Sequence, residues 1–344
     1  MKKNVNLDLI RSTAVFFVLS VHFFMHSGFY EEIITGSRMY LETTVRTTFA
    51  TCVPLFLLLS GYLMNQKTMS KKYYFSLFKV IIPYCFSLLC IGVYRMIIGD
   101  AYTIASLILD ILAFEYYSWY IEMYIGLYLM IPFLNIVYHN LQSKEQKKVL
   151  IAICAFITIV PTFFHAFDNP VLPDWWQTCY PVVHYFIGAY LAEYKEEIRI
   201  NLKLNFLLII ISILLTGAFC YWCSYNDVFN WGSWCTAGGI ANLFNAPLVF
   251  LFLLRLPLEG LPKWIVSVIQ TIAKVSLPIY LVSYIFDELW YPVLRAQMVM
   301  EQRLYYYPVS IVVTFGASFL LAVIVEKVST AVYRMLNKAV SEYM

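Results

Sequence analysis

The sequence predicts an all-α polytopic membrane protein, a bundle of about ten transmembrane helices with both termini in the cytoplasm. The first reason is composition. Of 344 residues, 61% are hydrophobic, 18% aromatic and only 13% charged, whereas a soluble domain typically has about 25% charged residues. The other two reasons are a succession of apolar runs and an alternation of charge between them. The small net charge of +3 gives no support to nucleic-acid binding.

The apolar runs have roughly the 20 residues that a membrane span requires. They lie at about 8–28, 43–65, 77–98, 118–138, 148–165, 178–193, 204–224, 237–256, 271–291 and 307–330. The run 103–114 is too short to span and carries Asp110, so we expect an interfacial or re-entrant helix there. Counting it as a span gives eleven, the alternative to ten.

The connections between the runs alternate in charge. One set carries most of the lysines and arginines, beginning with Lys2 and Lys3, and the other is mainly acidic. The positive-inside rule then places both termini in the cytoplasm, which favours an even number of spans. Because no small-residue cleavage site follows the first run, we expect a retained helix and not a signal peptide. Residues 1–344 are expected to form a single transmembrane domain.

The eight cysteines lie mostly in apolar runs, where cysteine behaves as a small hydrophobe. Cys220, Cys223 and Cys235 lie near one predicted membrane surface, and the sequence leaves open whether two of them form a disulfide. The Cys-Tyr-Trp-Cys spacing suggests zinc, but no histidine or second cysteine pair lies nearby in the sequence. We therefore expect no metal.

The first run contains two ionisable residues, Arg11 and His22. On a helix their side chains lie about 20° apart around the axis and roughly 16 Å apart along it, so they share one face at two depths. An ionisable side chain in a membrane helix costs about 2.5 to 3.5 kcal/mol, and such residues usually face a cavity or a partner. The alternative is that Arg11 extends to the lipid headgroups and that His22 is a packing residue.

Orientation assigns the other intramembrane polar residues to two layers. The inner layer is mainly cationic and the outer layer mixes acids, bases and histidines, a combination that suits proton transfer and recognition of a hydroxylated molecule. Residues near helix ends can instead be interfacial anchors, Glu122 can belong to a structural ion pair, and His184 can be a packed histidine. The inner residues are Arg11, Lys79, Lys274, Glu326 and Lys327; the outer ones are His22, His26, Arg46, Arg95, Glu122, His184, Asp287 and Glu288.

The spacing of Arg11 and His22 resembles the Arg-x10-His signature on the first helix of the acyltransferase 3 family of integral membrane acyltransferases. Further segments are similar to that family's motifs in the same order, and the family's ten-helix domain has this length. These segments are VPLFLLLSGYLM (53–64), YYFSLFKVIIPY (73–84), SWYIEMYIGLYLMIP (118–132), HYFIGAYLAEY (184–194) and SLPIYLVSYIF (276–286).

The resemblance implies an O-acyltransferase in a bacterial-type plasma membrane. It would move an acyl group, commonly acetyl, from cytoplasmic acetyl-CoA or another acyl-CoA to a hydroxyl of a cell-envelope polysaccharide or lipid-linked glycan. His22, Arg11 and Glu122 would be catalytic, with either general-base or covalent acyl-histidine chemistry. Arg11, Lys79 and Lys274 would hold the donor. The acceptor would contact Arg46, Arg95, Trp119, Tyr124 and His184.

Two positions depart from the family pattern. Lys79 stands where members usually show arginines before the helix proline, and lysine lacks the bidentate fork that arginine presents to phosphate. Ser283 stands where many members have histidine, so no role of that histidine carries over. No hydrolase-like domain follows residue 344, so a stand-alone mechanism is expected.

Two other classes remain open. A secondary transporter or flippase also places charges within the membrane, although no inverted repeat is visible here. A membrane protein that only binds or presents its ligand is the other alternative. Consumption of acyl-CoA separates an enzyme from both.

Overall fold

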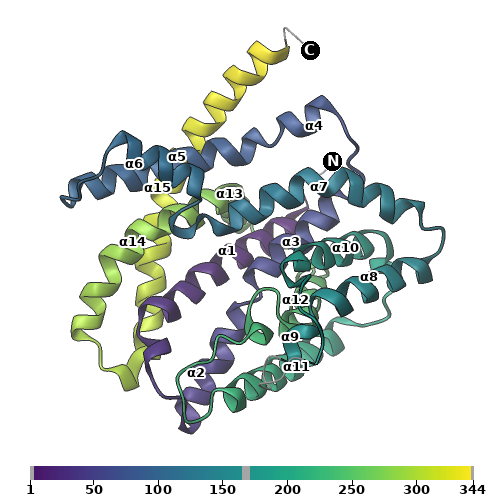
Figure 1. Ribbon diagram of the computed structural model, residues 1–344, viewed down its shortest axis with the longest axis horizontal. Coiled ribbons are helices and arrows are strands. Elements are labelled where there is room, and N and C mark those ends of the chain that lie inside the picture. Colours follow the sequence, from purple (N-terminus) through teal and green to yellow (C-terminus); the bar gives the residue numbers. More distant parts are fainter. Residues whose placement is uncertain (1–3, 165–170, 342–344) are drawn as a thin grey trace. The chain divides into compact units, whose positions relative to one another are not determined.

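The computed structural model describes residues 4–164 and 171–341. These residues are mainly helical and contain no β-strand, and two isolated bridges, Ile33 with Val228 and Ile34 with Tyr225, join two loops. The chain forms two compact units, each assembled from two stretches of sequence (Figure 1). Unit 1 is Met1–Lys67 with Ile131–Gln270, and unit 2 is Thr68–Met130 with Thr271–Met344.

The α-helices follow one another along the chain with six short 3₁₀ turns between them. They are α1 Val5–His26, α2 Gly36–Phe49, α3 Cys52–Met64, α4 Lys71–Phe75, α5 Phe78–Ile97, α6 Ile104–Ala113, α7 Trp119–Asn140, α8 Lys144–Thr158, α9 Pro161–Phe164, α10 Tyr180–Tyr194, α11 Leu202–Cys223, α12 Ile240–Leu254, α13 Lys263–Lys274, α14 Ser276–Gln297 and α15 Arg303–Ser341. The turns are η1 Phe29–Glu31, η2 Tyr116–Ser118, η3 Gln177–Cys179, η4 Lys195–Glu197, η5 Ser233–Cys235 and η6 Met300–Gln302.

The fold class predicted from the sequence is confirmed: the protein is all-α and polytopic. Within the described residues, seven helical stretches are long and apolar enough to cross a membrane, and the pair α13 and α14 makes an eighth if counted as one bent span. The other two predicted spans, 178–193 and 237–256, coincide with α10 and α12. The cytoplasmic position of both termini stays a prediction.

The two remaining helices, α10 and α12, are short, and a proline or a glycine lies at the start of each. α10 begins with Pro181 in its first turn, and α12 begins directly after Gly239. Each has 15 residues, about 22 Å of helix, whereas the hydrocarbon core is about 30 Å thick. Both helices are largely buried in unit 1, so protein and not lipid surrounds most of their surface.

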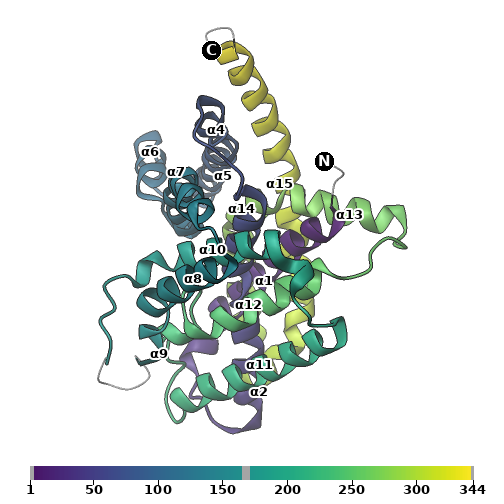
Figure 2. The same cartoon turned by 90° about the vertical axis from the view of Figure 1, so that its right-hand side faces the viewer.

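Unit 1 is built around the contact between α3 and α10 (Figure 1). Figure 2 shows another of its helix pairs, α2 beside α11. Two glycines allow the contact between α3 and α10. A Cβ atom added to Gly61 would lie 1.9 Å from the Tyr185 carbonyl oxygen, and one added to Gly188 would lie 2.1 Å from the Leu58 carbonyl oxygen. The backbones therefore touch, as small residues allow in membrane helix pairs. α1 packs beside α3 and α12, and α2 packs along α11.

Unit 2 is built around α14, α15 and α5, which pack against one another. The Trp290 indole nitrogen donates to the Ser310 hydroxyl at 3.1 Å, joining α14 to α15. Tyr73 and Tyr128 stack with their ring centroids 4.6 Å apart, and the hydroxyl of each donates to the backbone carbonyl of the other, at 2.6 and 2.9 Å. This reciprocal pair fixes α4 to α7.

The segment predicted as a short interfacial or re-entrant element forms α6, within unit 2. A capping box begins the helix, since Thr103 Oγ1 accepts from the Ser106 backbone N–H at 3.2 Å and Ser106 Oγ accepts from the Thr103 N–H at 3.3 Å. One side is apolar and outward-facing, with Ile104, Ile108 and Leu112 at 74%, 53% and 70% exposure. Such a helix is suited to lie in a membrane interface.

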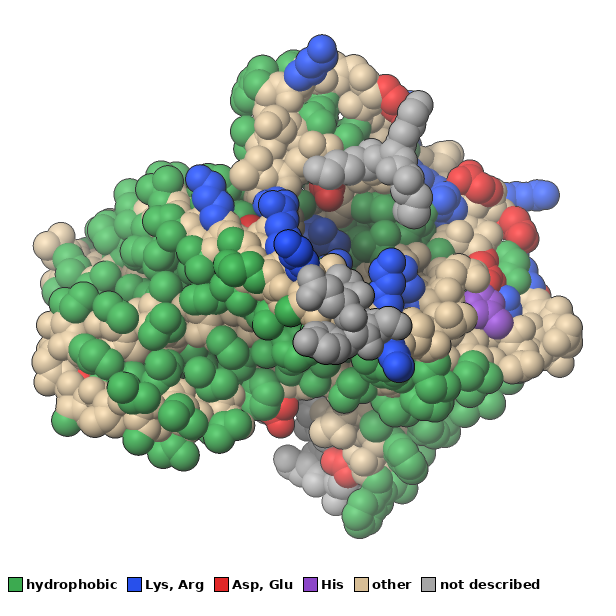
Figure 3. Space-filling model, turned by 90° about the horizontal axis from the view of Figure 1, so that it is seen from above, with side chains coloured by type: hydrophobic (Ala, Val, Ile, Leu, Met, Phe, Trp, Pro, Cys, Tyr) green, Lys and Arg blue, Asp and Glu red, His purple; other side chains and the backbone are tan. Residues whose placement is uncertain are grey.

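Hydrophobic side chains cover much of the surface seen in Figure 3. Leu215 on α11 is 65% exposed, and Val312 and Leu320 on α15 are 73% and 69% exposed. In water, large contiguous apolar surfaces of this kind are rare and mark contact with another phase or partner. Together with the long apolar helices, they identify a multi-pass membrane protein.

Candidate active site

Helix α1 carries Arg11 and His22 in unit 1. It runs without a break from Val5 to His26, so the two side chains keep the shared face and the roughly 16 Å separation that the sequence predicts. Ser12 Oγ donates to the Ile269 carbonyl at 3.0 Å. The neighbouring turn of α1 is therefore held in place by a hydrogen bond as well as by packing.

The two residues differ in their surroundings. His22 is buried, with 6% exposure. Arg11 is half-buried. Within residues 4–164 and 171–341, its guanidinium makes no hydrogen bond or ion pair. A half-buried guanidinium in that state retains all five of its N–H donors for an anionic ligand.

Arg46 on α2 lies in an aromatic cage, which we define as Tyr30, Phe229 and Trp231. The guanidinium carbon is 5.7, 4.7 and 4.7 Å from the three ring centroids. Nε donates to the Tyr30 hydroxyl and Nη1 to the Cys235 carbonyl, both at 2.9 Å. Burial raises the pKa of the Tyr30 hydroxyl, although the adjacent guanidinium lowers it. Arg46 is 2% exposed, so here it joins α2 to loop 224–239.

The three cysteines singled out by the sequence lie around this loop. All described cysteines are free thiols, so the disulfide that the sequence left open is not formed in this structure. Cys220 and Cys235 are buried and their thiols hydrogen-bond, which lowers the pKa of the Cys235 thiol. Cys223 is half-buried.

His184 on α10 is fully buried. Its Nδ1 lies 3.2 Å from the Tyr180 carbonyl oxygen one turn earlier, and the two rings make an edge-to-face contact at 6.1 Å. This is the environment of a packed histidine, the alternative noted from the sequence. Its assignment to the acceptor site stays a prediction.

Three predicted site residues lie on α7 in unit 2. Glu122 and Trp119 are exposed, the latter at 48%. Tyr124 belongs to a ladder of tyrosines at four-residue spacing, 5.8 Å from the ring of Tyr120 and 6.1 Å from that of Tyr128. The exposed carboxylate of Glu122 and the tyrosine ladder occupy different faces of the helix, because two residues correspond to about 200° of rotation.

The predicted donor-binding lysines, Lys79 and Lys274, also lie in unit 2. The Lys79 ammonium is 5.2 Å from the Tyr333 ring centroid. The Lys274 ammonium is 3.7 Å from a carboxylate oxygen of Glu326, although Lys274 is 61% exposed. An exposed ion pair of this kind contributes little to stability, and the nearby carboxylate offsets part of the charge that a phosphate would meet.

Arg95, near the end of α5, forms an ion pair with Asp100. Its guanidinium carbon lies 6.0 Å from the Tyr116 ring centroid. Arg95 therefore faces a carboxylate and an aromatic ring of its own unit. A cavity adjoins this pair.

The structure thus distributes the predicted residues between the two units. Unit 1 holds Arg11, His22, Arg46 and His184; unit 2 holds Lys79, Arg95, Trp119, Glu122, Tyr124 and Lys274. The catalytic and binding roles of all ten stay predictions.

Sequence reasoning missed the environment of two buried carboxylates. Glu42, on α2, is 1% exposed and lies 3.0 Å from Arg38. Its four-residue spacing from Arg38 is the signal in the sequence for a helical ion pair. Asp287, on α14, is also 1% exposed, and its Oδ2 accepts from the Tyr117 hydroxyl at 3.0 Å.

Comparison with known proteins identifies the family. The family model for the acyltransferase 3 group, described as an acyltransferase domain, matches residues 4–323. No curated protein and no solved structure matches the chain. The match runs from the first described residue into α15 and includes every predicted site residue. The chain therefore belongs to the acyltransferase 3 family and is a membrane acyltransferase.

Proposed function

We propose that this acyltransferase moves an acyl group, most simply acetyl, from cytoplasmic acyl-CoA to a hydroxyl of a cell-envelope or exported carbohydrate in a bacterial-type plasma membrane. The observation that carries the proposal is α1. A single uninterrupted helix presents a half-buried arginine and a buried histidine on one face at two depths, within a chain of the acyltransferase 3 family.

Arg11 is the proposed contact for the donor. Acyl-CoA carries phosphates, and guanidinium groups bind phosphate through paired, charge-assisted hydrogen bonds. The support for this role is that the described residues leave its donors unengaged. Lys79 and Lys274 are the proposed additional cations, with the Lys274 contribution reduced by Glu326.

His22 is the proposed general base. An imidazole nitrogen takes the proton from the acceptor hydroxyl as its oxygen attacks the thioester carbonyl. The C–S bond then breaks, and the coenzyme A sulfur leaves and takes up the proton that the imidazolium returns. An acyl-histidine intermediate, formed by direct attack of the imidazole on the thioester, is the second route. Glu122 is proposed to orient or charge-balance the imidazole, the role assigned to it from the sequence.

The deciding experiment is turnover of acetyl-CoA by purified protein in lipid nanodiscs, with a mixture of envelope glycans as acceptors. We expect His22→Ala to reduce transfer by about 10²- to 10⁴-fold, the usual contribution of a general base. The matched control is His26→Ala, which removes a histidine from the next turn of the same helix and is expected to retain turnover.

Thermal unfolding of both variants separates a catalytic loss from a folding defect. Wild-type transfer by a folded His22→Ala protein would contradict the proposed role of His22. If the wild-type protein neither binds nor consumes acetyl-CoA, its intramembrane charges are better explained by a secondary transporter or flippase.

A further inference from the structure

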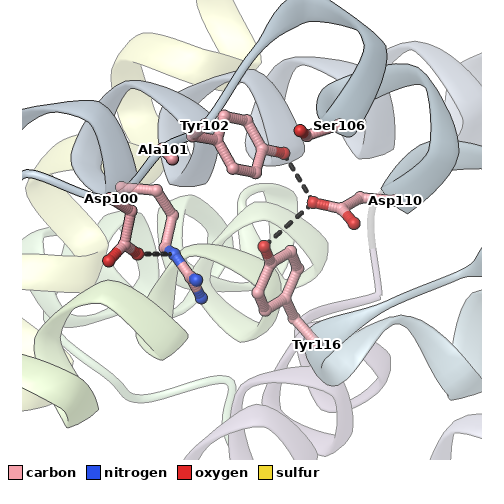
Figure 4. A pocket seen from close by; sticks show the side chains of 7 residues that line it. Asp100, Ala101, Tyr102, Ser106, Asp110 and Tyr116 are labelled. Carbon is pink, nitrogen blue, oxygen red and sulfur yellow. Dashed lines mark hydrogen bonds and ion pairs between the residues drawn. The ribbon is translucent and has the colours of Figure 1, made fainter.

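Unit 2 contains a polar cavity of about 350 Å³ beside the ion pair of Arg95 (Figure 4). Its lining comes from the end of α5, the loop before α6, α6 itself and η2. The lining residues are Arg95, Asp100, Ala101, Tyr102, Ser106, Asp110 and Tyr116. The volume lies within the range of small-ligand sites, at its lower end.

Two tyrosines converge on one carboxylate in this cavity. The Tyr102 hydroxyl donates to Asp110 Oδ2 at 2.6 Å, and the Tyr116 hydroxyl donates to the same oxygen at 2.9 Å. Desolvation and the Asp110 carboxylate raise the pKa of Tyr102 above its ordinary value. The Tyr102 hydroxyl is therefore protonated at neutral pH. Both tyrosines donate to Oδ2, so Oδ1 is the atom that we expect to accept from a ligand.

The walls of the cavity are fixed by contacts outside it. The Tyr102 ring lies against α5, where a Cβ atom added to Gly92 would be 2.8 Å from the ring. The Tyr84 hydroxyl donates to the Ile111 carbonyl at 2.8 Å and holds α6 to α5. Tyr116 has a positive φ of 60°, an uncommon backbone conformation that persists only where its surroundings hold it. Contacts with α5 therefore fix the positions of Tyr102 and α6, two parts of the cavity lining.

The charges of the lining select against an anion. One guanidinium and two carboxylates give a formal charge of −1, so a phosphate or an acyl-CoA tail would meet net repulsion. The remaining features are carboxylate acceptors, a serine hydroxyl and two aromatic rings. Carboxylates accept hydrogen bonds from hydroxyl groups, and aromatic rings provide apolar faces with a polar edge. A neutral polyhydroxylated ring matches this combination.

We infer that this cavity binds one neutral pyranose unit of the carbohydrate acceptor, with Asp110 as the main hydrogen-bond acceptor and the two tyrosines as the aromatic faces. The inference rests on the proposed function. α6 supports it, because the exposed apolar side of this helix, at Ile104, Ile108 and Leu112, predicts that α6 lies in the membrane interface. A cavity bounded by α6 then lies at the depth where the sugar of a lipid-linked glycan is held.

Binding is measured first without any acyl donor. The full-length protein in phosphatidylcholine nanodiscs is titrated with radiolabelled methyl α-D-hexopyranosides of the gluco, manno and galacto series. We expect at least one to bind. We expect Asp110→Asn, which preserves the shape of the side chain but removes its charge, to weaken that binding at least 10-fold. The matched control is Glu301→Gln, an exposed acid-to-amide change outside the cavity, which should leave binding unchanged.

A second variant tests the cavity without removing a polar contact. Ala101 lies on the exposed loop before α6, so Ala101→Trp is expected to fill the cavity while the protein stays folded, as checked by thermal unfolding. It should abolish binding of the same methyl hexoside. Retained wild-type affinity in both Asp110→Asn and Ala101→Trp would overturn the inference, as would failure of every hexoside to bind.

Turnover then separates this inference from the proposed function. In transfer assays with glycan acceptor, Asp110→Asn should raise the KM for the acceptor at least 10-fold and leave the KM for acetyl-CoA unchanged. Hexoside binding that both cavity variants abolish, in a protein that transfers no acyl group, would support the site and reject the proposed reaction. Transfer whose acceptor KM is insensitive to both variants would reject the site and leave the reaction standing.

Discussion

The glycine contact between α3 and α10 gives the sharpest test of the fold. In Gly61→Ala the new Cβ would lie 1.9 Å from the Tyr185 carbonyl oxygen, and ordinary contact begins at 3.4 Å, so the helices must separate by about 1.5 Å. Gly188→Ala requires a similar separation, from 2.1 Å. Overpacking typically costs about 1 to 3 kcal/mol. Because backbone and not a flexible side chain stands in the way, we expect about 3 kcal/mol for each.

The assay is thermal unfolding of the purified variants, followed by tryptophan fluorescence. A change of about 3 kcal/mol corresponds to a lowering of Tm by about 6 to 12 °C in a folding unit of roughly 200 residues, the size of unit 1. Gly126→Ala and Gly316→Ala are the matched controls, because nothing lies within 4 Å of a Cβ at either position. Alanine is favoured over glycine in a helix by about 1 kcal/mol, so these variants should match or exceed the wild-type Tm.

The double variant adds an internal check. Both new methyl groups force apart the same pair of helices, so the combined loss should be smaller than the sum of the two single losses. A Tm within about 2 °C of wild type for Gly61→Ala and Gly188→Ala, less than the change expected for 1 kcal/mol, would refute direct backbone contact between α3 and α10.

Three further predictions concern single side chains. Arg11→Ala should raise the apparent KM for acyl-CoA about 10-fold or more, the loss of one charge-assisted bond, and leave the acceptor KM nearly unchanged; Arg199→Ala, which removes an exposed arginine, is its control. Asn135→Ala removes hydrogen bonds from the side-chain amide to the Met64 and Lys67 carbonyls, at 2.9 and 2.8 Å. It should lower the free energy of unfolding by about 2 to 4 kcal/mol. Its control Asn140→Ala, at an exposed position, should cost less than about 0.5 kcal/mol. Trp231→Leu opens the aromatic cage and should cost about 1 to 2 kcal/mol, seen as a lower Tm; an unchanged Tm would contradict the cage's structural role.

Much of the fold follows from local sequence. The predicted runs all coincide with helices, because apolar length and charge alternation are properties of contiguous residues. The same holds for the first helix with Arg11 and His22, and for the short element that became α6.

Non-local arrangements were not predictable in this way. The cage around Arg46 is completed by Phe229 and Trp231, which are separated from Arg46 by more than half of the chain. The sequence places Arg46 in an apolar run, but nothing in it indicates that Phe229 and Trp231 contact this arginine. One residue that lines the unit 2 cavity stands out in the sequence, because Asp110 is a charged residue in the apolar run 103–114. The two tyrosines that converge on it depend on a backbone turn at Tyr116, for which the residue type gives no signal.

The sequence contains no Gly-x3-Gly pair, a common motif for close helix pairing in membranes. Within unit 1, two single glycines take its place. One glycine on α3 and one on α10 serve the same purpose from opposite sides. Both belong to segments that resemble family motifs, VPLFLLLSGYLM and HYFIGAYLAEY. Their place in those motifs has a packing explanation that requires no contact with substrate.

The contact between α3 and α10 cannot form until both helices have been synthesised. Gly188 follows Gly61 by 127 residues (188 − 61), which at about 5 to 20 residues per second takes roughly 6 to 25 seconds of synthesis. During that interval α10 is not yet present to cover the α3 backbone at Gly61. Lipid tails or an insertion chaperone must cover it instead. A methyl group at either glycine would therefore disturb membrane assembly of the newly synthesised chain. Its first measurable effect would be faster degradation of that chain, before any loss of activity in the folded enzyme.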